Sequence, residues 1–143
     1  MDDLDQKLLA ALAADSSTST SRLARRFKVA RSTVQARIER METTGIIAGY
    51  TVKLGNVALA RRIKATVLVN VEPRETAGVV QRLRAMPEVE VAHTTTGRSD
   101  LILQVAADTT TGLDEVLDRV GMVAGVRGLE SLIHLTTKFD RAV

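Results

Sequence analysis

The sequence contains no cysteine and no tryptophan, and its aromatic side chains are one tyrosine and two phenylalanines. Without cysteine the chain cannot form a disulfide, a thiolate metal site or a cysteine nucleophile. Proteins that stack the bases of RNA or single strands need aromatic platforms, so that class of binding is disfavoured. No apolar run approaches the roughly 18 residues of a membrane span, and the start MDDLDQK does not resemble a signal peptide. We therefore expect a cytoplasmic protein without a metal ion or other cofactor.

Positive charge is concentrated in one part of the sequence, between Arg22 and Arg40. This segment contains seven lysine and arginine residues and one glutamate, a net charge of +6. The remaining residues carry a net charge of −3, so the whole chain carries +3. A basic helical surface is often only a solvated face, and some helix-turn-helix units bind only proteins. The concentration of charge favours contact with the phosphates of double-stranded DNA.

The basic segment is predicted to form two short amphipathic helices. Their apolar faces consist of Leu23, Ala24 and Phe27 in the first helix and of Val34, Ile38 and Met41 in the second. A turn of about three residues joins them, which is typical of a helix-turn-helix. The face opposite the second apolar stripe should carry Ser32, Thr33, Ala36, Glu39 and Arg40, with Gln35 beside it. Arg37 lies nearer the stripe, so we expect it to contact a phosphate or to brace the neighbouring helix. The residues predicted to bind DNA are Arg22, Arg25, Arg26, Arg31, Ser32, Thr33, Gln35, Ala36, Arg37 and Arg40.

Residues 1–53 are predicted to form one DNA-binding domain around this motif. A first helix is expected to begin with Asp3 as its cap and Gln6 three residues later, and to bury a leucine every fourth residue. Residues 46–52 are expected to form a short strand that ends the domain. Residues 54–62 are predicted to be a linker.

Beyond the linker the hydrophobic period changes from about 3.6 to about 2 residues, which is typical of β-strands. Strands are predicted at 63–71, 89–95, 101–107 and 129–137, and the second and third should form a hairpin around Gly97. A helix is expected to begin at Pro73, and another near Thr109. The inward residues are predicted to be Ala77, Val80 and Leu83 in the former and Leu113, Val116, Leu117 and Val120 in the latter. The order βαββαβ predicts a ferredoxin-like domain over residues 63–143, and hence an α+β fold.

Several strands of this second domain carry apolar side chains on both of their faces. Leu68 is one such residue, and Leu132, Ile133 and Leu135 follow close together in the last strand. A four-stranded sheet with two helices has one face open, so these residues favour pairing with a second sheet. Isolated exposed leucines are also common in monomers. A homodimer would suit DNA binding, because two recognition helices can contact half-sites about 34 Å apart.

The element order and three motifs resemble the Lrp/AsnC family of prokaryotic transcription regulators. The motifs are LDQKLLAAL, LARRFKVARSTVQARIERMETTGII and TTGRSDLILQV, and the resemblance covers nearly the whole chain. It implies a DNA-binding domain tethered to a regulatory domain that dimerises through its sheets and often assembles into a ring of four dimers, an octamer. It also implies a small effector, commonly an amino acid, bound between dimers.

The resemblance assigns the effector site to the hairpin loop formed by Thr96, Gly97, Arg98, Ser99 and Asp100. Gly97 permits a positive φ and close approach of a ligand, and free backbone N–H groups in a tight turn can hold a carboxylate. Arg98 could pair with a carboxylate, and Asp100 could accept from an ammonium group. The same residues also suit a plain hairpin turn in which the glycine makes the bend and the aspartate caps it.

The sequence departs from the family pattern in two places. Lys28 stands where many members have glycine, and Ala30 where they have a serine cap, a loss of about 0.5–2 kcal/mol of helix stability. In the hairpin, Arg98 and Ser99 replace the aromatic residue often found between the glycine and the aspartate. This indicates an acidic or polar ligand, or a site that holds none.

Two other functions remain open alongside a sequence-specific, effector-modulated regulator. Decarboxylases of haem-precursor synthesis have a similar two-domain arrangement, but an enzyme needs titratable groups gathered in a pocket. The two histidines, His93 and His134, lie on predicted strands, Tyr50 lies in the other domain, and no catalytic or metal-ligand spacing is present. We therefore expect no enzymatic activity. The other alternative is an architectural DNA-binding protein without sequence preference.

Overall fold

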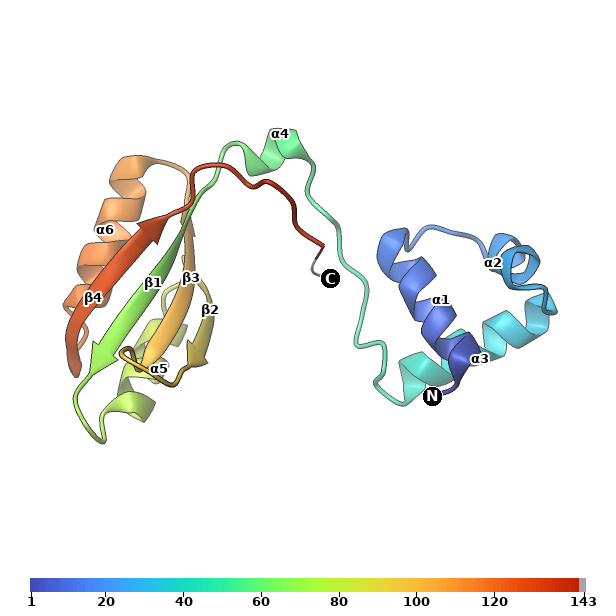
Figure 1. The fold of residues 1–143 in the computed structure, drawn as a ribbon, viewed down its shortest axis with the longest axis horizontal. Helices are drawn as coiled ribbons and strands as arrows, with labels where there is room; N and C mark the ends of the chain where they lie inside the picture. The colour runs from blue at the N-terminus through green and yellow to red at the C-terminus, as the bar shows by residue number, and fades with distance from the viewer. Residues whose placement is uncertain (142–143) are drawn as a thin grey trace. The chain divides into compact units, whose positions relative to one another are not determined.

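A computed structural model describes residues 1–141 of the chain, which divide into two compact units built on residues 1–53 and 54–140 (Figure 1). The first unit consists of three helices, and the second combines an antiparallel sheet with helices. The predicted α+β fold class is thereby confirmed. No helix among the described residues is long and apolar enough to cross a membrane.

The first unit packs α1 (Asp3–Ala14), α2 (Thr20–Phe27) and α3 (Arg31–Thr43) around a small core. Its buried side chains are Leu8, Ala11, Leu23, Ala24, Val34 and Met41. The helix α1 is capped one residue earlier than the sequence predicts. Asp2 is the cap and accepts from the N–H of Asp5 at 3.0 Å, while Asp5 accepts from the N–H of Asp2 at 3.3 Å. Asp5 rather than Gln6 therefore completes the capping box, because it stands three residues after the true cap.

The turn between α2 and α3 shows both departures from the family pattern in its backbone. Lys28 ends α2 in the left-handed conformation, with φ of +56°, which disfavours any residue with a Cβ atom. Ala30 occupies the cap position of α3 without a side-chain hydrogen bond. In contrast, the hydroxyl of Ser19 caps α2 by accepting from the N–H of Arg22 at 3.1 Å. The helix-turn-helix thus has one well-capped and one uncapped helix.

The segment that follows α3 differs from the expectation. Gly45 adopts a positive φ of +82°, and the N–H of Ile47 donates to the carbonyl of Met41 at 2.9 Å, which ends the helix. Residues 46–52 form no strand, because no strand of residues 1–141 pairs with them. The predicted linker contains a short helix, α4 (Asn56–Leu59).

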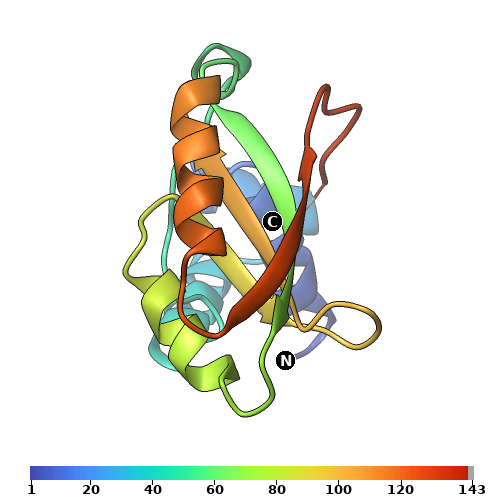
Figure 2. The same cartoon turned by 90° about the vertical axis from the view of Figure 1, so that its left-hand side faces the viewer.

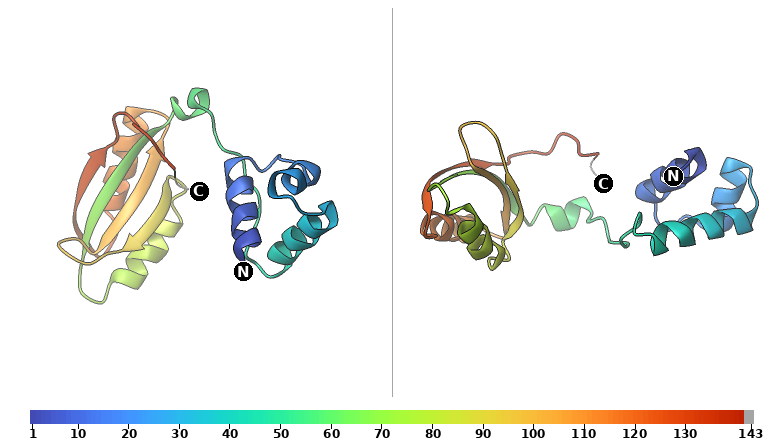
Figure 3. Two further views of the ribbon diagram at one scale, coloured as in Figure 1. Left: turned by 45° about the vertical axis from the view of Figure 1, so that its right-hand side comes forward. Right: turned by 90° about the horizontal axis from the view of Figure 1, so that it is seen from below.

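The second unit is a four-stranded antiparallel sheet with the strand order β2-β3-β1-β4 (Figure 3). Its strands are β1 (Ile63–Val71), β2 (Val89–Thr94), β3 (Leu101–Ala107) and β4 (Val126–Ile133). Two helices, α5 (Thr76–Arg84) and α6 (Thr110–Gly121), lie on the same side of the sheet (Figure 2). The order and connections are those of the predicted ferredoxin-like arrangement. The core between sheet and helices includes Val67 and Leu103 from the central strands and Leu83 and Val116 from the helices, all at most 2% exposed.

Three predicted details of this unit are wrong. Pro73 does not begin a helix but lies in a turn closed by the bond from the N–H of Glu75 to the carbonyl of Glu72 at 3.0 Å. Arg74 in the next turn position has φ of +71°, so Pro73 and Arg74 have the features of a type II turn and α5 starts at Thr76. Because of this later start, α5 buries Val79 and leaves Ala77 exposed. The strand β4 spans 126–133 rather than 129–137.

The position of β4 follows from its neighbour in the sheet. The register pairs Ala65 with Ile133, and the N–H of His134 then donates to the carbonyl of Lys64 at 2.9 Å. Since β1 begins at Ile63, almost no backbone remains there for a longer β4 to pair with. Leu135 consequently lies beyond the strand and is 95% exposed.

One face of the sheet carries neither α5 nor α6, and we call it the open face. Directly paired residues of antiparallel strands point to the same side, which places Leu68 with its partners Ile102 and Glu130 on this face. Leu132 pairs with Thr66 on the same face and is 49% exposed. The open face is therefore partly apolar at its centre and near one end.

Candidate nucleic-acid interface and small-molecule site

The outer face of α3 is built from small and polar side chains. Ser32, Gln35, Ala36 and Glu39 are exposed, whereas Thr33 is half-buried. Val34 and Met41 anchor the opposite face in the core and so fix which side of the helix is presented. The amide of Gln35 donates to the carboxylate of Glu39 at 3.3 Å, one turn further along the helix. A helix surface without bulky side chains can approach the base edges of a major groove.

Five cations of α2, the turn and α3 are free of ion pairs. None of them comes within 4.0 Å of a carboxylate among residues 1–141, and all five are exposed. They are Arg22, Arg25, Arg26, Lys28 and Arg31. Such a group of unneutralised cations on one helical motif is suited to contact with the phosphate backbone of DNA.

The other two arginines of the basic segment are bonded to α1. Arg37 pairs with both Asp2 and Asp5, the latter at 3.3 Å from Nη1 to Oδ1, so the expectation that it braces the neighbouring helix is confirmed. Arg40 is expected on the DNA-facing side, yet its Nη2 lies 2.8 Å from Oδ2 of Asp5. Asp5 is fully buried, and Asp2 and Asp5 together neutralise the two guanidinium groups. We therefore count Arg40 with Arg37 as a brace between α1 and α3.

The aspartates of this cluster are held in the charged form. Burial raises the pKa of Asp5, whereas hydrogen bonds from the Asp2 N–H and from Arg37 lower it. The lowering is the larger effect, so the pKa falls below its ordinary value. The hydrogen bond from Arg37 likewise lowers the pKa of Asp2. Asp15 and Glu88, elsewhere in the chain, are also shifted downward, by Ser17 and by Arg119 respectively. The sequence patterns missed Asp2 and Asp5, because helical periodicity describes one helix and not its neighbour.

The predicted effector loop, residues 96–100, connects β2 with β3 at one end of the sheet. Gly97 has the expected positive φ, +99°. Asp100 fastens the loop to the end of β1: its N–H donates to the carbonyl of Val69 at 2.9 Å, and its Oδ2 accepts from the N–H of Val71 at 2.8 Å. The capping role of Asp100 is thus present in the structure. Its second oxygen, Oδ1, makes no hydrogen bond to residues 1–141.

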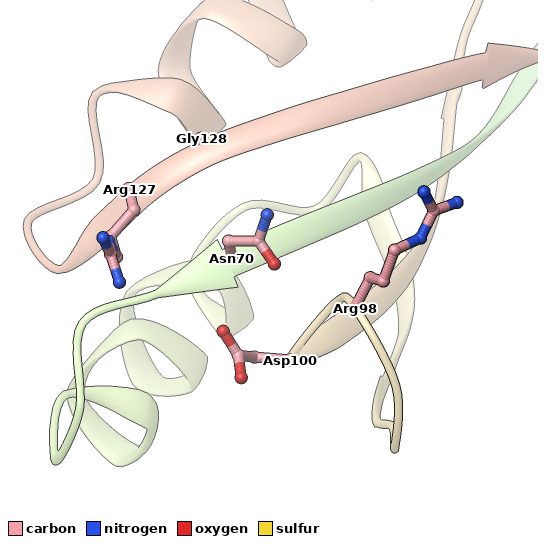
Figure 4. Close-up of a pocket in the computed structure, with 5 residues that line it drawn as sticks. All are labelled: Asn70, Arg98, Asp100, Arg127 and Gly128. Atoms are coloured by element: carbon pink, nitrogen blue, oxygen red, sulfur yellow. The ribbon is translucent and has the colours of Figure 1, made fainter.

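A polar depression of about 490 Å³ lies beside this loop on the open face (Figure 4). Asn70 and Asp100 lie at its centre, with Arg98 from the hairpin and Arg127 from β4 on opposite sides. Gly128 forms part of its floor, and no atom lies within 4 Å of the position of a Cβ there. Thr96 and Ser99 line an adjoining hollow that continues over Leu68 and Ile102. Asn70, Arg127 and Gly128 were not predicted from the sequence. The pairing of β1 with β3 brings Asn70 to the hairpin, and the pairing of β1 with β4 adds Arg127 and Gly128.

Both histidines belong to the second unit, on or next to its sheet. His93 lies on β2 and pairs across the sheet with Ile102, while Nε2 of His134 is 2.7 Å from the hydroxyl of Thr66. Among residues 1–141, no group of three or more His, Asp or Glu side chains could hold a metal ion.

Comparison with protein families gives two matches that together span most of the chain. The AsnC-type helix-turn-helix domain matches residues 1–42, and the Lrp/AsnC ligand binding domain matches residues 64–143. An uncharacterised HTH-type transcriptional regulator of Pyrococcus furiosus is 32% identical over 139 residues, which cover 96% of this chain and 94% of the relative. The HTH-type transcriptional regulator LrpA of Mycobacterium tuberculosis is 30% identical over 142 residues, covering 99% of this chain and 95% of LrpA.

Solved structures show the same architecture. The structure of Escherichia coli AsnC matches with a TM-score of 0.90 at 25% identity, covering 100% of this chain and 97% of that one. A feast or famine regulatory protein from M. tuberculosis, solved in complex with L-methionine, matches with a TM-score of 0.86 at 30% identity, covering 98% and 95%. This chain belongs to the Lrp/AsnC family of HTH-type transcriptional regulators.

Proposed function

We propose that this regulator binds specific duplex DNA sequences with the outer face of α3, in the cytoplasm and as an assembly of identical chains. The observation that carries the proposal is that the helix-turn-helix presents two kinds of side chain, small or uncharged ones on the outer face of α3 and unpaired cations around them. Ser32, Gln35 and Ala36 present short polar or apolar groups to the bases. The five unpaired cations of α2, the turn and α3 contact phosphates on either side.

The open face of the sheet is the surface through which two copies associate. Leu68 and Ile102 lie opposite each other at its centre, and Leu132 is half exposed near its end. Covering such a surface with a second sheet removes apolar area from water and places two copies of α3 on one DNA molecule. Further association of dimers into an octamer follows the pattern that the family resemblance implies. Both assemblies are readily measured by light scattering.

The effector site lies in the depression beside the hairpin, and an amino acid fits its chemistry. Arg98 can bind an α-carboxylate, and the unbonded Oδ1 of Asp100 can accept from an α-ammonium group. The main-chain N–H groups around Gly97 add donors. The matched ligand binding domain and the relative solved with L-methionine support this assignment. The predicted effector residues are Thr96, Gly97, Arg98, Ser99 and Asp100.

DNA recognition is tested by comparing two glutamine variants. Gln35→Ala removes an amide from the outer face of α3, and Gln81→Ala removes another exposed amide, from α5. We expect Gln35→Ala to weaken binding to the upstream region of the protein's own gene by about tenfold, the effect of losing about 1.4 kcal/mol of base contact. Gln81→Ala should bind as the wild type does. Equal affinity of both variants would contradict the assignment of α3.

Comparing the wild-type protein's affinity for this upstream region with its affinity for random duplex DNA distinguishes a sequence-specific regulator from an architectural protein. We expect the upstream region to bind at least about 10³-fold more tightly than random duplex at the same salt concentration. Equal affinities would favour the architectural alternative.

The effector site is tested by thermal unfolding against a panel of amino acids. A ligand at 100 times its dissociation constant should stabilise the protein by roughly 2.7 kcal/mol. Arg98→Gln should abolish the shift without changing the unfolding temperature of the free protein, because Arg98 is exposed. A panel without any stabilising amino acid would contradict the proposed effector class.

A further inference from the structure

The buried carboxylate of Asp5 divides the basic residues of the helix-turn-helix into two groups. Asp5 is the one buried charged residue of the part of the chain that the structure describes. Its Oδ1 accepts from Arg37 at 3.3 Å, and its Oδ2 accepts from Arg40 at 2.8 Å. Arg37 and Arg40 stand three residues apart on α3, so both reach the same place on α1.

Asp2, Asp5, Arg37 and Arg40 form a cluster whose two negative and two positive charges cancel. Asp2 accepts from Arg37 and from the N–H of Asp5, and Asp5 accepts from the N–H of Asp2. Two carboxylates thereby face two guanidinium groups. A buried carboxylate is tolerated only when it is paired and hydrogen-bonded, so Asp5 opposes any movement of an arginine away from it.

The two arginines of the cluster differ in how far their side chains are exposed to solvent, and hence to DNA. The side chain of Arg40 is 56% exposed and that of Arg37 is 29% exposed. More than half of the Arg40 side chain is therefore open to solvent beside α3, while its head group is bonded to Asp5 on α1. Arg31, at the start of the same helix, has no such partner among residues 1–141.

We infer that Asp5 is a positioning residue that keeps Arg37 and Arg40 on α1 and withholds these two of the seven cations from DNA phosphates. The inference rests on the proposed binding of DNA by α3. Phosphate contacts add affinity for every sequence, whereas base contacts distinguish sequences. By withholding two cations, Asp5 lowers the affinity for every DNA sequence and the salt dependence of binding, and leaves the distinction between sequences to the base contacts of α3.

The salt dependence of binding to random duplex DNA tests this inference. The slope of log K against log salt is about −0.9 for each phosphate neutralised. Arg31→Gln should make the slope shallower by about 0.9 per bound protomer. Arg40→Gln and Arg37→Gln should leave it unchanged, because their charges are already neutralised. A loss of slope in Arg40→Gln equal to that in Arg31→Gln would overturn the inference.

Removing the carboxylate gives the converse test. Asp5→Asn should release Arg40 and make the slope steeper by about 0.9 per bound protomer. Asp3→Asn is the matched control, because it removes a carboxylate from the same helix that pairs only with Lys7 at the surface. The double variant Asp5→Asn with Arg40→Gln should return to the wild-type slope. Equal slopes of Asp5→Asn and Asp3→Asn would show a purely structural role for Asp5.

Three further outcomes are distinguishable. If Asp5→Asn fails to fold by circular dichroism, the comparison of Arg31→Gln with Arg40→Gln decides the question alone. If the wild-type protein binds no DNA at any salt concentration, the proposed function fails. If it binds and the two arginine variants behave alike, only the role of Asp5 fails.

Discussion

Replacing Ala30 by serine should stabilise the helix-turn-helix, because the backbone at that position is already that of a capping residue. Ala30 has φ of −69° and ψ of 147°, and Ser19, which caps α2, has φ of −68° and ψ of 152°. A serine hydroxyl at residue 30 should therefore reach the N–H of Thr33 as Ser19 reaches that of Arg22, at 3.1 Å. No rearrangement of the main chain is needed.

The magnitude follows from the cap that is added. Gaining a serine cap in place of alanine is worth about 1 kcal/mol, within a range of about 0.5–2 kcal/mol. Native-state hydrogen exchange of the full chain measures this locally, and the amides of α3 should exchange about fivefold more slowly for a gain of about 1 kcal/mol. Ser19→Ala should have the opposite effect on the amides of α2.

The control is Ala36→Ser, which places the same side chain in the exposed interior of α3. There serine should lower helix stability by a few tenths of a kcal/mol, because it competes for backbone hydrogen bonds. If Ala30→Ser gives no protection while Ser19→Ala costs about 1 kcal/mol, the reasoning from matched dihedral angles is refuted.

Three other predictions concern the core, the open face and pH. Gly125→Ala should lower the free energy of unfolding in urea by about 2–4 kcal/mol, because φ is +100° and the new Cβ would lie 2.8 Å from Val79. Gly49→Ala is the control and should have little effect, since its new Cβ would have no neighbour within 4 Å. Leu132→Asp should reduce the molar mass measured by light scattering and keep the circular dichroism spectrum, whereas an unchanged mass would exclude the open face as the interface. The four carboxylates with lowered pKa values stabilise the fold while ionised, so the unfolding temperature should fall as pH drops below about 4.5 and through their folded-state pKa values. Glu88→Gln should make that fall smaller, and an identical pH profile would contradict the role of the Glu88–Arg119 pair.

Sequence periodicity predicted the elements whose limits are set by their own residues. The strands β1 and β3 have the predicted bounds, because apolar residues recur at every second position in each and mark the buried face. The family resemblance marked Lys28 and Ala30 as departures from the pattern, and the structure gives Lys28 a left-handed backbone and Ala30 no side-chain cap bond.

The features that periodicity missed depend on a second element. Pro73 suits both a helix start and a type II turn, and only the bond between Glu72 and Glu75 selects the turn. The end of β4 is set by the start of β1. The placement of Arg40 depends on Asp5 in another helix, and that of Arg127 near Asp100 depends on the strand order. Each requires knowledge of which elements are neighbours in space.

The order of strands in the sheet has a consequence for synthesis on the ribosome. Both neighbours of β1 come later in the chain, and its pairing with β4 is complete only when residue 133 has been made. The helices of residues 1–53 make short-range contacts and can fold as they emerge. In contrast, β1 cannot pair until β3 and β4 have been synthesised, and its valines stay exposed until then. During synthesis the regulator thus carries a folded amino-terminal unit and an unpaired apolar strand, β1, at the same time.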